Sequence, residues 1–322
     1  MSRGALIPLI LALAAAFLLS LALPYGSFAD LYARDPDLAS ALLIELRLPR
    51  AMLALTYGAA LGACGAAVQT IFANPLASPD LTGTTSGAAL GAVVAAYLFE
   101  FASPLALSFG SVAGAMGALG LLLALAGPRA ETSTLLLAGL AISALAGALT
   151  TLALALAPSP FAFYDAYEWL MGSLVDRSLN QALFALIPTT VCIALLLTRV
   201  RALDSLALGE QPAQAIGYDV RRLRLAVIAL TAIAVGACVA VCGAIGFIGL
   251  VAPIFARRIT GGRPGSAILP AAGIGALLLL GADLVVRLAP LGRTLPIGVA
   301  TAILGAPFFL WLVTHMRWKL AR

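Results

Sequence analysis

Residues 208–224 read LGEQPAQAIGYDVRRLR, a polar stretch between two long apolar runs near 180–199 and 223–243. Each run is long enough to cross a bilayer, because a spanning helix needs about 20 apolar residues. A short polar helix–turn flanked by arginines is what a membrane protein would present to a soluble motor. Nothing else in the chain could supply energy, so this stretch directs attention to what crosses the membrane and what drives it.

The composition excludes a soluble protein, since 62% of the 322 residues are hydrophobic and 10% are charged, against about half and a quarter in soluble domains. Mean hydropathy is +1.06. We predict an all-α polytopic membrane protein with one domain over 1–322. The ten candidate spans lie near 4–23, 50–72, 82–99, 104–126, 133–157, 180–199, 223–243, 245–260, 266–287 and 295–315. The 245–260 run is the weakest, because it carries Pro253 and ends on two arginines.

The distribution of Lys and Arg predicts the orientation, since cytoplasmic loops carry an excess of both. Ten spans place 13 of these residues on the side of the termini and 6 on the other, which accounts for all 19. We therefore expect cytoplasmic termini, external segments at 24–49 and 158–179, and a cytoplasmic element at about 202–222. The aromatic 158–179 segment predicts a short interfacial helix. No basic run is interleaved with aromatics, so we expect no nucleic-acid partner.

Glycines recur at four-residue spacing within several predicted spans. Such small residues let helices approach closely inside a bilayer, so we interpret them as packing positions in a tight bundle. They are Gly58, Gly62, Gly83, Gly87, Gly91, Gly110 and Gly114.

The sequence contains no motif for catalysis by this chain alone. No Gly-x-x-x-x-Gly-Lys-Ser/Thr loop occurs, and Lys319 is the one lysine, so the chain cannot be a P-loop ATPase. His315 is the one histidine. Cys238 and Cys242 share a helix face, but without a nearby histidine or second pair we interpret them as packing residues rather than metal ligands. We expect no catalytic residue and no metal site.

Asp283 is the sole acid well inside a span. Intramembrane acids are candidates for proton relays, but Arg287 lies one helical turn later and can pair with it. We favour structural pairing and keep a proton-coupled secondary transporter as an alternative. A receptor or scaffold that transports nothing is a second alternative.

Two polar groups flank spans at the predicted cytoplasmic face. Asn74-Pro75-Leu76 follows the second span, and Thr132-Ser133 begins the fifth. Helix capping would explain them, and so would a constriction at the inner mouth of a pathway. The spacing alone does not choose between these readings.

Four segments together resemble the permeases of type II ABC importers for ferric siderophores, haem or cobalamin. They are RLPRAMLALTYGAALGACGAAVQTIFANPLASPDLTGTTSGAALGA (47–92), LLLAGLAIS (135–143), LALGEQPAQAIGYDVRRLR (206–224) and the region from GAIGFIGLVAPIFARR to LPIGVATAILGAPFFLWLV (243–313). They occur in the family's order over nearly the whole chain. Where many members read Pro-His after GLV, this chain has Pro253-Ile254.

The resemblance implies a bacterial inner-membrane permease that works as a homodimer with a cytoplasmic ABC ATPase dimer and a periplasmic binding protein. ATP-Mg would be used by the ATPase, with no cofactor in this chain. The implied coupling residues are Leu208, Gly209, Glu210, Ala213, Ile216 and Gly217. Docking arginines are Arg47, Arg50 and Arg287, to which we expect the nearby Arg293 to add. The implied cytoplasmic gate is Asn74, Leu76, Thr132 and Ser133. A ferric siderophore is the expected cargo, with haem or cobalamin as alternatives.

Overall fold

The computed structural model describes residues 3–98, 104–127, 132–289 and 295–320, and these ranges contain helices and loops without a strand. Each of the ten predicted runs contains a helix, which confirms the all-α polytopic class. Within these described ranges, six helices are long and apolar enough to cross a membrane, and three shorter apolar ones accompany them. The nine helices of 15 or more residues in these ranges are α1 (Arg3–Ala22), α4 (Leu48–Ile71), α5 (Thr84–Leu98), α6 (Pro104–Ala126), α7 (Thr132–Ala155), α9 (Leu179–Leu197), α12 (Val220–Cys242), α14 (Ile268–Leu288) and α15 (Ile297–Leu320).

The eighth predicted run, 245–260, does not form a full-length span in the described structure. Its helix α13 (Ile248–Ile259) has 12 residues, about 18 Å of helix, and residues 243–247 before it are not helical. Backbone N–H and C=O groups of a non-helical segment inside the bundle need hydrogen-bond partners from elsewhere in the protein. Tyr57 of α4 supplies two, because its hydroxyl donates to the Gly243 carbonyl at 3.1 Å and accepts from the Ile245 N–H at 3.2 Å.

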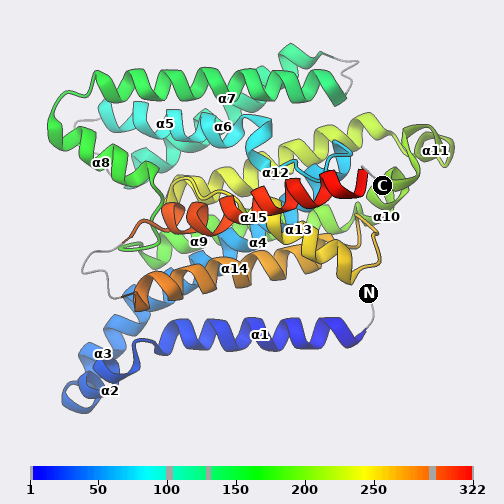
Figure 1. Ribbon diagram of the computed structural model, residues 1–322. Coiled ribbons are helices and arrows are strands. Elements are labelled where there is room, and N and C mark those ends of the chain that lie inside the picture. Colours follow the sequence, from blue (N-terminus) through cyan, green and yellow to red (C-terminus); the bar gives the residue numbers. More distant parts are fainter. Residues whose placement is uncertain (1–2, 99–103, 128–131, 290–294, 321–322) are drawn as a thin grey trace.

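Short helices gather at the two ends of the bundle (Figure 1). One end carries α2 (Tyr25–Arg34), α3 (Pro36–Leu42), the π-helical turn η1 (Leu43–Arg47) and α8 (Pro160–Leu170). The opposite end carries α10 (Val200–Ser205), the turn η3 (Leu206–Leu208) and α11 (Glu210–Ala215), beside the start of α1 and the end of α15. The helix expected within 158–179 is confirmed as α8. The side of the membrane that each end faces stays a prediction.

The centre of the bundle is held by helices whose backbones touch. A Cβ on Gly58 of α4 would lie 2.4 Å from the carbonyl oxygen of Gly275 in α14, and one on Gly62 would lie 1.9 Å from that of Ala271. Gly91 of α5 meets Gly110 of α6 in the same manner, with 2.0 Å from the added Cβ to the carbonyl oxygen. The packing role predicted for these glycines is confirmed.

Gly83 differs from the other glycines predicted to pack within a span. It ends the 3₁₀ turn η2 (Pro79–Thr82), just before α5, with a left-handed φ of 76°. A Cβ there would also lie 2.7 Å from the Ile142 side chain of α7. Gly83 therefore serves both a turn and a close helix contact, whereas the spacing predicted only the contact.

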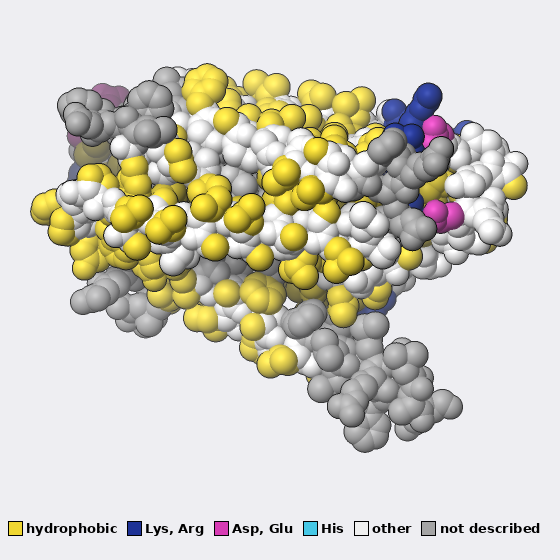
Figure 2. Space-filling view, turned by 90° about the horizontal axis from the view of Figure 1, so that it is seen from above, with side chains coloured by type: hydrophobic (Ala, Val, Ile, Leu, Met, Phe, Trp, Pro, Cys, Tyr) yellow, Lys and Arg dark blue, Asp and Glu magenta, His cyan; other side chains and the backbone are white. Residues whose placement is uncertain are grey.

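The outer surface is apolar along most of its length. Figure 2 shows hydrophobic side chains over the middle of one face, while Lys, Arg, Asp and Glu gather at the end that carries α10 and α11. The exposed large side chains of α7 and α15 include Leu137, Leu140, Leu152, Ile303, Leu304 and Leu310. A contiguous apolar surface of this extent is typical of membrane or subunit contact.

Candidate functional site

The short helix α11 is closed at both ends by glycines in conformations that other residues rarely adopt. Gly209 precedes it at φ 101°, and Gly217 follows it at φ 100°. The Tyr218 N–H donates to the Ala213 carbonyl at 3.1 Å, and the Gly217 N–H donates to that of Gln214 at 2.8 Å. This pair of bonds is a Schellman motif, which ends a helix sharply with a left-handed residue. The predicted helix–turn is therefore a compact, well-defined element.

Apolar side chains project from this element into the surroundings. Leu208 is 69% exposed and Ile216 is 63% exposed, whereas Ala213 is fully buried against the bundle. Large apolar side chains at a polar end of the molecule are typical of a surface that a partner protein covers. Ala213 thus anchors the element, and Leu208 and Ile216 are free to contact a partner.

Glu210 forms an ion pair with Arg224 in the first two turns of α12. The Arg224 side chain is 9% exposed and that of Glu210 is 51% exposed. The pair joins α11 to a long apolar helix while one carboxylate oxygen stays near the surface. Among the six residues predicted for coupling, Glu210 alone supplies a side-chain bond to a spanning helix in the described structure.

A second connection between the α10–α11 end and the bundle comes from Asp204 of α10, which the sequence did not single out. Its Oδ1 accepts from the N–H groups of Gly265 and Ser266 at 2.8 and 3.2 Å, and its Oδ2 accepts from the Ser266 hydroxyl at 3.0 Å. These partners lie just before α14 and more than 60 residues along the chain. No local sequence signal connects them.

The other end of α14 contains a buried cluster of charge. Asp283, with a side chain 1% exposed, binds both Arg287 and Arg50. Arg50 of α4 approaches it through Nε at 2.9 Å and through a terminal nitrogen at 2.8 Å. The predicted Asp283–Arg287 pair is confirmed. Arg50 is an additional partner that joins α4 to α14 across 233 residues of sequence.

The remaining arginine contacts bring the end of α1 into this cluster. Arg287 donates to the Ser20 carbonyl at 2.8 Å, and Arg47 donates to the carbonyls of Leu21 and Ala22 at 2.7 and 3.1 Å. Arg47, Arg50 and Arg287 line one cavity of about 480 Å³. The structure therefore brings together three of the four predicted docking arginines, and Arg293 lies outside the described residues.

Of the four predicted gate residues, Asn74 and Leu76 are joined to each other by a hydrogen bond. Asn74 makes a local turn, in which its Oδ1 accepts from the Leu76 N–H at 2.9 Å. Ser133 is exposed in the first turn of α7, and Thr132 begins that helix. Contact between α7 and the turn η2, which lies between Leu76 and α5, occurs further along α7, where the Ser143 hydroxyl donates to the Asp80 carbonyl at 3.1 Å.

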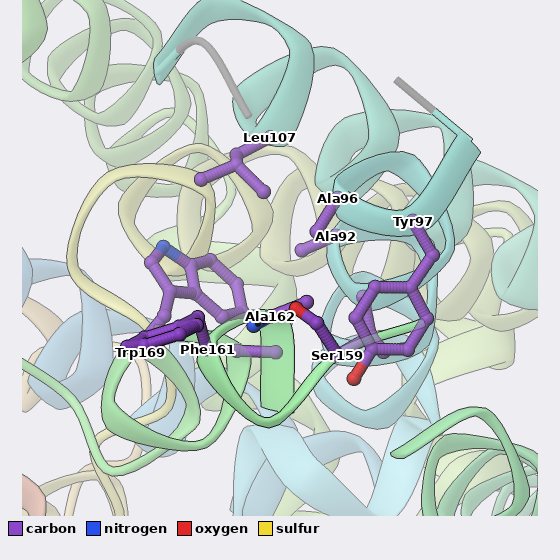
Figure 3. A pocket seen from close by; sticks show the side chains of 10 residues that line it. Ala92, Ala96, Tyr97, Leu107, Ser159, Phe161, Ala162 and Trp169 are labelled. Carbon is purple, nitrogen blue, oxygen red and sulfur yellow. Dashed lines mark hydrogen bonds between the residues drawn. The ribbon is translucent and has the colours of Figure 1, made fainter. Parts of the chain in front are cut away.

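A second cavity, of about 280 Å³, lies under α8 at the same end as the arginine cluster. Figure 3 shows Trp169 of α8 and Tyr97 of α5 on opposite sides of it, with Ser159 and Phe161 between them. Its wall is completed by small and apolar side chains of α5 and α6, such as Ala92 and Leu107. This lining contains no charged side chain, in contrast to the arginine cavity.

The arrangement thus has exposed apolar side chains, Leu208 and Ile216, at one end and three arginines around a cavity at the other. The sequence profile of the FecCD transport family matches residues 6–315. The chain belongs to the FecCD transport family. Related proteins of this family include the Fe(3+) dicitrate transport system permease protein FecD of Escherichia coli (strain K12), 40% identical over 86% of each chain.

The names of two further relatives refer to two different substrates, vitamin B12 and ferric citrate. The vitamin B12 import system permease protein BtuC of Vibrio cholerae is 38% identical over 87% of this FecCD-family chain and 84% of its own. The Fe(3+)-citrate import system permease protein YfmE of Bacillus subtilis (strain 168) is 36% identical over 84% and 81%. Membership therefore identifies a membrane permease, and the names of the relatives divide between iron chelates and a cobalamin.

Solved structures agree with this FecCD-family fold. One, described as an inward-facing conformation of a metal-chelate type ABC transporter, has a TM-score of 0.86 and 31% identity over 97% of this chain and 99% of its own. Another, PsaBC from Streptococcus pneumoniae in complex with Fab, has a TM-score of 0.56 at 15% identity over 88% of this chain and 93% of its own. The second likeness shows the fold alone.

Proposed function

We propose that this chain is the transmembrane permease subunit of a binding-protein-dependent ABC importer that moves a ferric siderophore across the bacterial inner membrane. A separate ATPase dimer hydrolyses ATP-Mg at the α10–α11 end, and a periplasmic binding protein docks at the arginine end. Two copies of the permease enclose the pathway. Alternating access is the mechanism, with Asn74, Leu76, Thr132 and Ser133 at its inner mouth.

The observation that carries this proposal is the pairing of two unlike surfaces across one bundle. Leu208 and Ile216 offer apolar contacts at one end, and three arginines surround a cavity at the other. A soluble ATPase would bury the first surface. Acidic side chains of a binding protein would complement the second, and such charges govern encounter rate and salt dependence.

The cargo is proposed from family resemblance, with haem or cobalamin as alternatives. FecD and YfmE are named for ferric citrate and BtuC for vitamin B12, and their identities to this chain are similar. The proposal therefore takes an iron chelate as the substrate class. Proton coupling through Asp283 is disfavoured, because two arginines from two helices hold its carboxylate in a buried cluster.

The test is ATPase activity of the permease purified with its ATPase subunit in nanodiscs. The cognate binding protein is added after loading in turn with a ferric siderophore, haem and cobalamin. We expect the siderophore-loaded protein to stimulate hydrolysis, and Glu210→Ala to abolish the stimulation. Failure to form a complex with any ATPase subunit, or cargo uptake without nucleotide, would overturn the proposal. Stimulation by haem or cobalamin alone would replace the cargo and leave the importer.

A further inference from the structure

The turn that leads into α14 is held by a residue from another helix. Ala267, at the N-cap position, makes no side-chain cap, and the two residues before it, Gly265 and Ser266, bond to Asp204 of α10. The Asp204 carboxylate accepts from the N–H groups of Gly265 and Ser266 and from the Ser266 hydroxyl. Hydrogen bonds to an ionised carboxylate are roughly twice as strong as neutral ones, and negative charge is favoured near a helix N-terminus.

The backbones at this junction are also in direct contact. A Cβ on Gly265 would lie 2.2 Å from the Val200 carbonyl oxygen and 3.1 Å from the Asp204 backbone nitrogen. The loop before α14 therefore rests on α10 itself, so steric contact and hydrogen bonding fix the same relative position. A displacement of α10 would displace the start of α14 or break these bonds.

From this junction α14 extends as part of a stiff pair with α4. Gly58 and Gly275 bring the two backbones together near the middle of the pair, and Arg50 binds Asp283 near its far end. About 17 residues of helix, or roughly 25 Å, separate Ser266 from Asp283. The pair therefore connects the α10 junction to the cavity of three arginines.

We propose that Asp204 is a positioning residue that transmits movement of the segment from α10 to α11, on which the ATPase would dock, to α14. This inference rests on the proposed function, because it assumes an ATPase docked on α11. The Glu210–Arg224 pair leads to α12, so the element has two separate connections to the bundle. The Asp204 connection is the one that reaches the helix carrying Asp283 and Arg287.

The experiment measures ATP hydrolysis and cargo uptake together in proteoliposomes containing the complete transporter. Asp204→Ala removes all three acceptor contacts. We expect the complex to assemble and hydrolyse ATP at its basal rate, while stimulation by loaded binding protein and cargo imported per ATP both fall by about fivefold, the lower end of typical coupling between sites. Asp204→Asn retains an oxygen for the two N–H groups, so it should restore most of the lost coupling.

Two further variants separate coupling from stability. Ser266→Ala removes only the 3.0 Å side-chain bond and should give a smaller loss of uptake per ATP at an unchanged unfolding temperature. Thr260→Ala removes only hydroxyl bonds to carbonyls in and beside the same loop. It should leave the amount of cargo imported per ATP unchanged. If Asp204→Ala does not fold, Ser266→Ala and Asp204→Asn decide the question.

A wild-type ratio of uptake to hydrolysis in Asp204→Ala, or in Ser266→Ala where the alanine variant at 204 does not fold, would overturn the inference. Equal defects in Asp204→Asn and Asp204→Ala would overturn it as well, because the amide retains the backbone bonds. These results leave the importer proposal intact, since that proposal is overturned by other findings: no complex with any ATPase subunit, or cargo uptake without nucleotide.

Discussion

Two carboxylates at opposite ends of the bundle form ion pairs with arginine in very different surroundings. The side chain of Asp283 is 1% exposed and lies between two arginines, whereas that of Glu210 is 51% exposed and binds one. A buried ion cannot exchange its partner for water, and a half-exposed one can. The comparison separates a cluster that holds helices together from a pair that a docking protein can rearrange.

The energetics follow from the same contrast. Removing one member of a buried charge cluster leaves an uncompensated charge, which typically costs about 3–5 kcal/mol. An ion pair with both members exposed contributes about 0–1 kcal/mol, because water and salt screen it, and the Glu210–Arg224 pair, with one half-exposed and one largely buried member, lies between these two cases. The Asp283 cluster should therefore dominate stability, and Glu210 should affect activity more than stability.

The largest effect is expected from Asp283→Ala. The variant leaves Arg50 and Arg287 without their shared carboxylate, so we expect the free energy of unfolding to fall by about 3–5 kcal/mol. Thermal unfolding of the detergent-solubilised protein measures this. Asp219→Ala, which removes a half-exposed carboxylate that caps α12, is the control, with an expected loss of about 1 kcal/mol.

A stable Asp283→Ala protein that has lost only nucleotide-independent uptake would contradict the structural role. It would favour the proton-coupled alternative instead. A poorly stable protein whose residual uptake still depends on ATP would support the reading of Asp283 as a structural anion.

The Asp283 cluster also shows where sequence reasoning succeeds and where it stops. Arg287 could be predicted because it lies one turn away on the same helix, but Arg50 and Asp204 bind partners that only the tertiary fold brings near. The long helices could be predicted from the length of the apolar runs. The break at 243–247 could not be predicted, because the Tyr57 hydroxyl that satisfies its backbone comes from a helix 186 residues away.

The second prediction sharpens the comparison by loosening the α4–α14 contact without touching a charge. In Gly58→Ala the new methyl would lie 2.4 Å from the Gly275 carbonyl oxygen, so the helices must separate, at a cost of about 1–3 kcal/mol or more. The control is Gly281→Ala in α14, the other helix of this contact, where nothing lies within 4 Å of the new methyl. It should leave the unfolding temperature unchanged or raise it slightly.

Equal losses of stability in Gly58→Ala and Gly281→Ala would show that helix contact is not the cause. A lower unfolding temperature in Gly58→Ala alone would show that the α4–α14 backbone contact, like the Asp283 cluster, stabilises the bundle.

The third prediction concerns Glu210, the half-exposed carboxylate of the comparison. Glu210→Gln removes the charge that holds Arg224 but leaves an oxygen that can accept from it, so we expect a smaller loss of stability than in Asp283→Ala, together with loss of binding-protein-stimulated ATPase activity. Both quantities are measured on the same preparation. Gln211→Ala, a neighbouring exposed position on α11, is the matched control and should retain stimulation.

The smallest effect is expected from Arg222→Ala, two residues before Arg224 on α12. Arg222 Nε lies 3.0 Å from Asp219 Oδ2, but the two side chains are 87% and 53% exposed. The Asp219 cap survives the substitution, because its Oδ1 accepts from the backbone N–H of residue 222 at 3.0 Å. We therefore expect no measurable shift in unfolding temperature at physiological salt, where exposed pairs are screened. A shift as large as that of Glu210→Gln would show that burial does not separate these two pairs, and the contrast between anchored and rearrangeable charges would have to be replaced by one based on sequence position along α12.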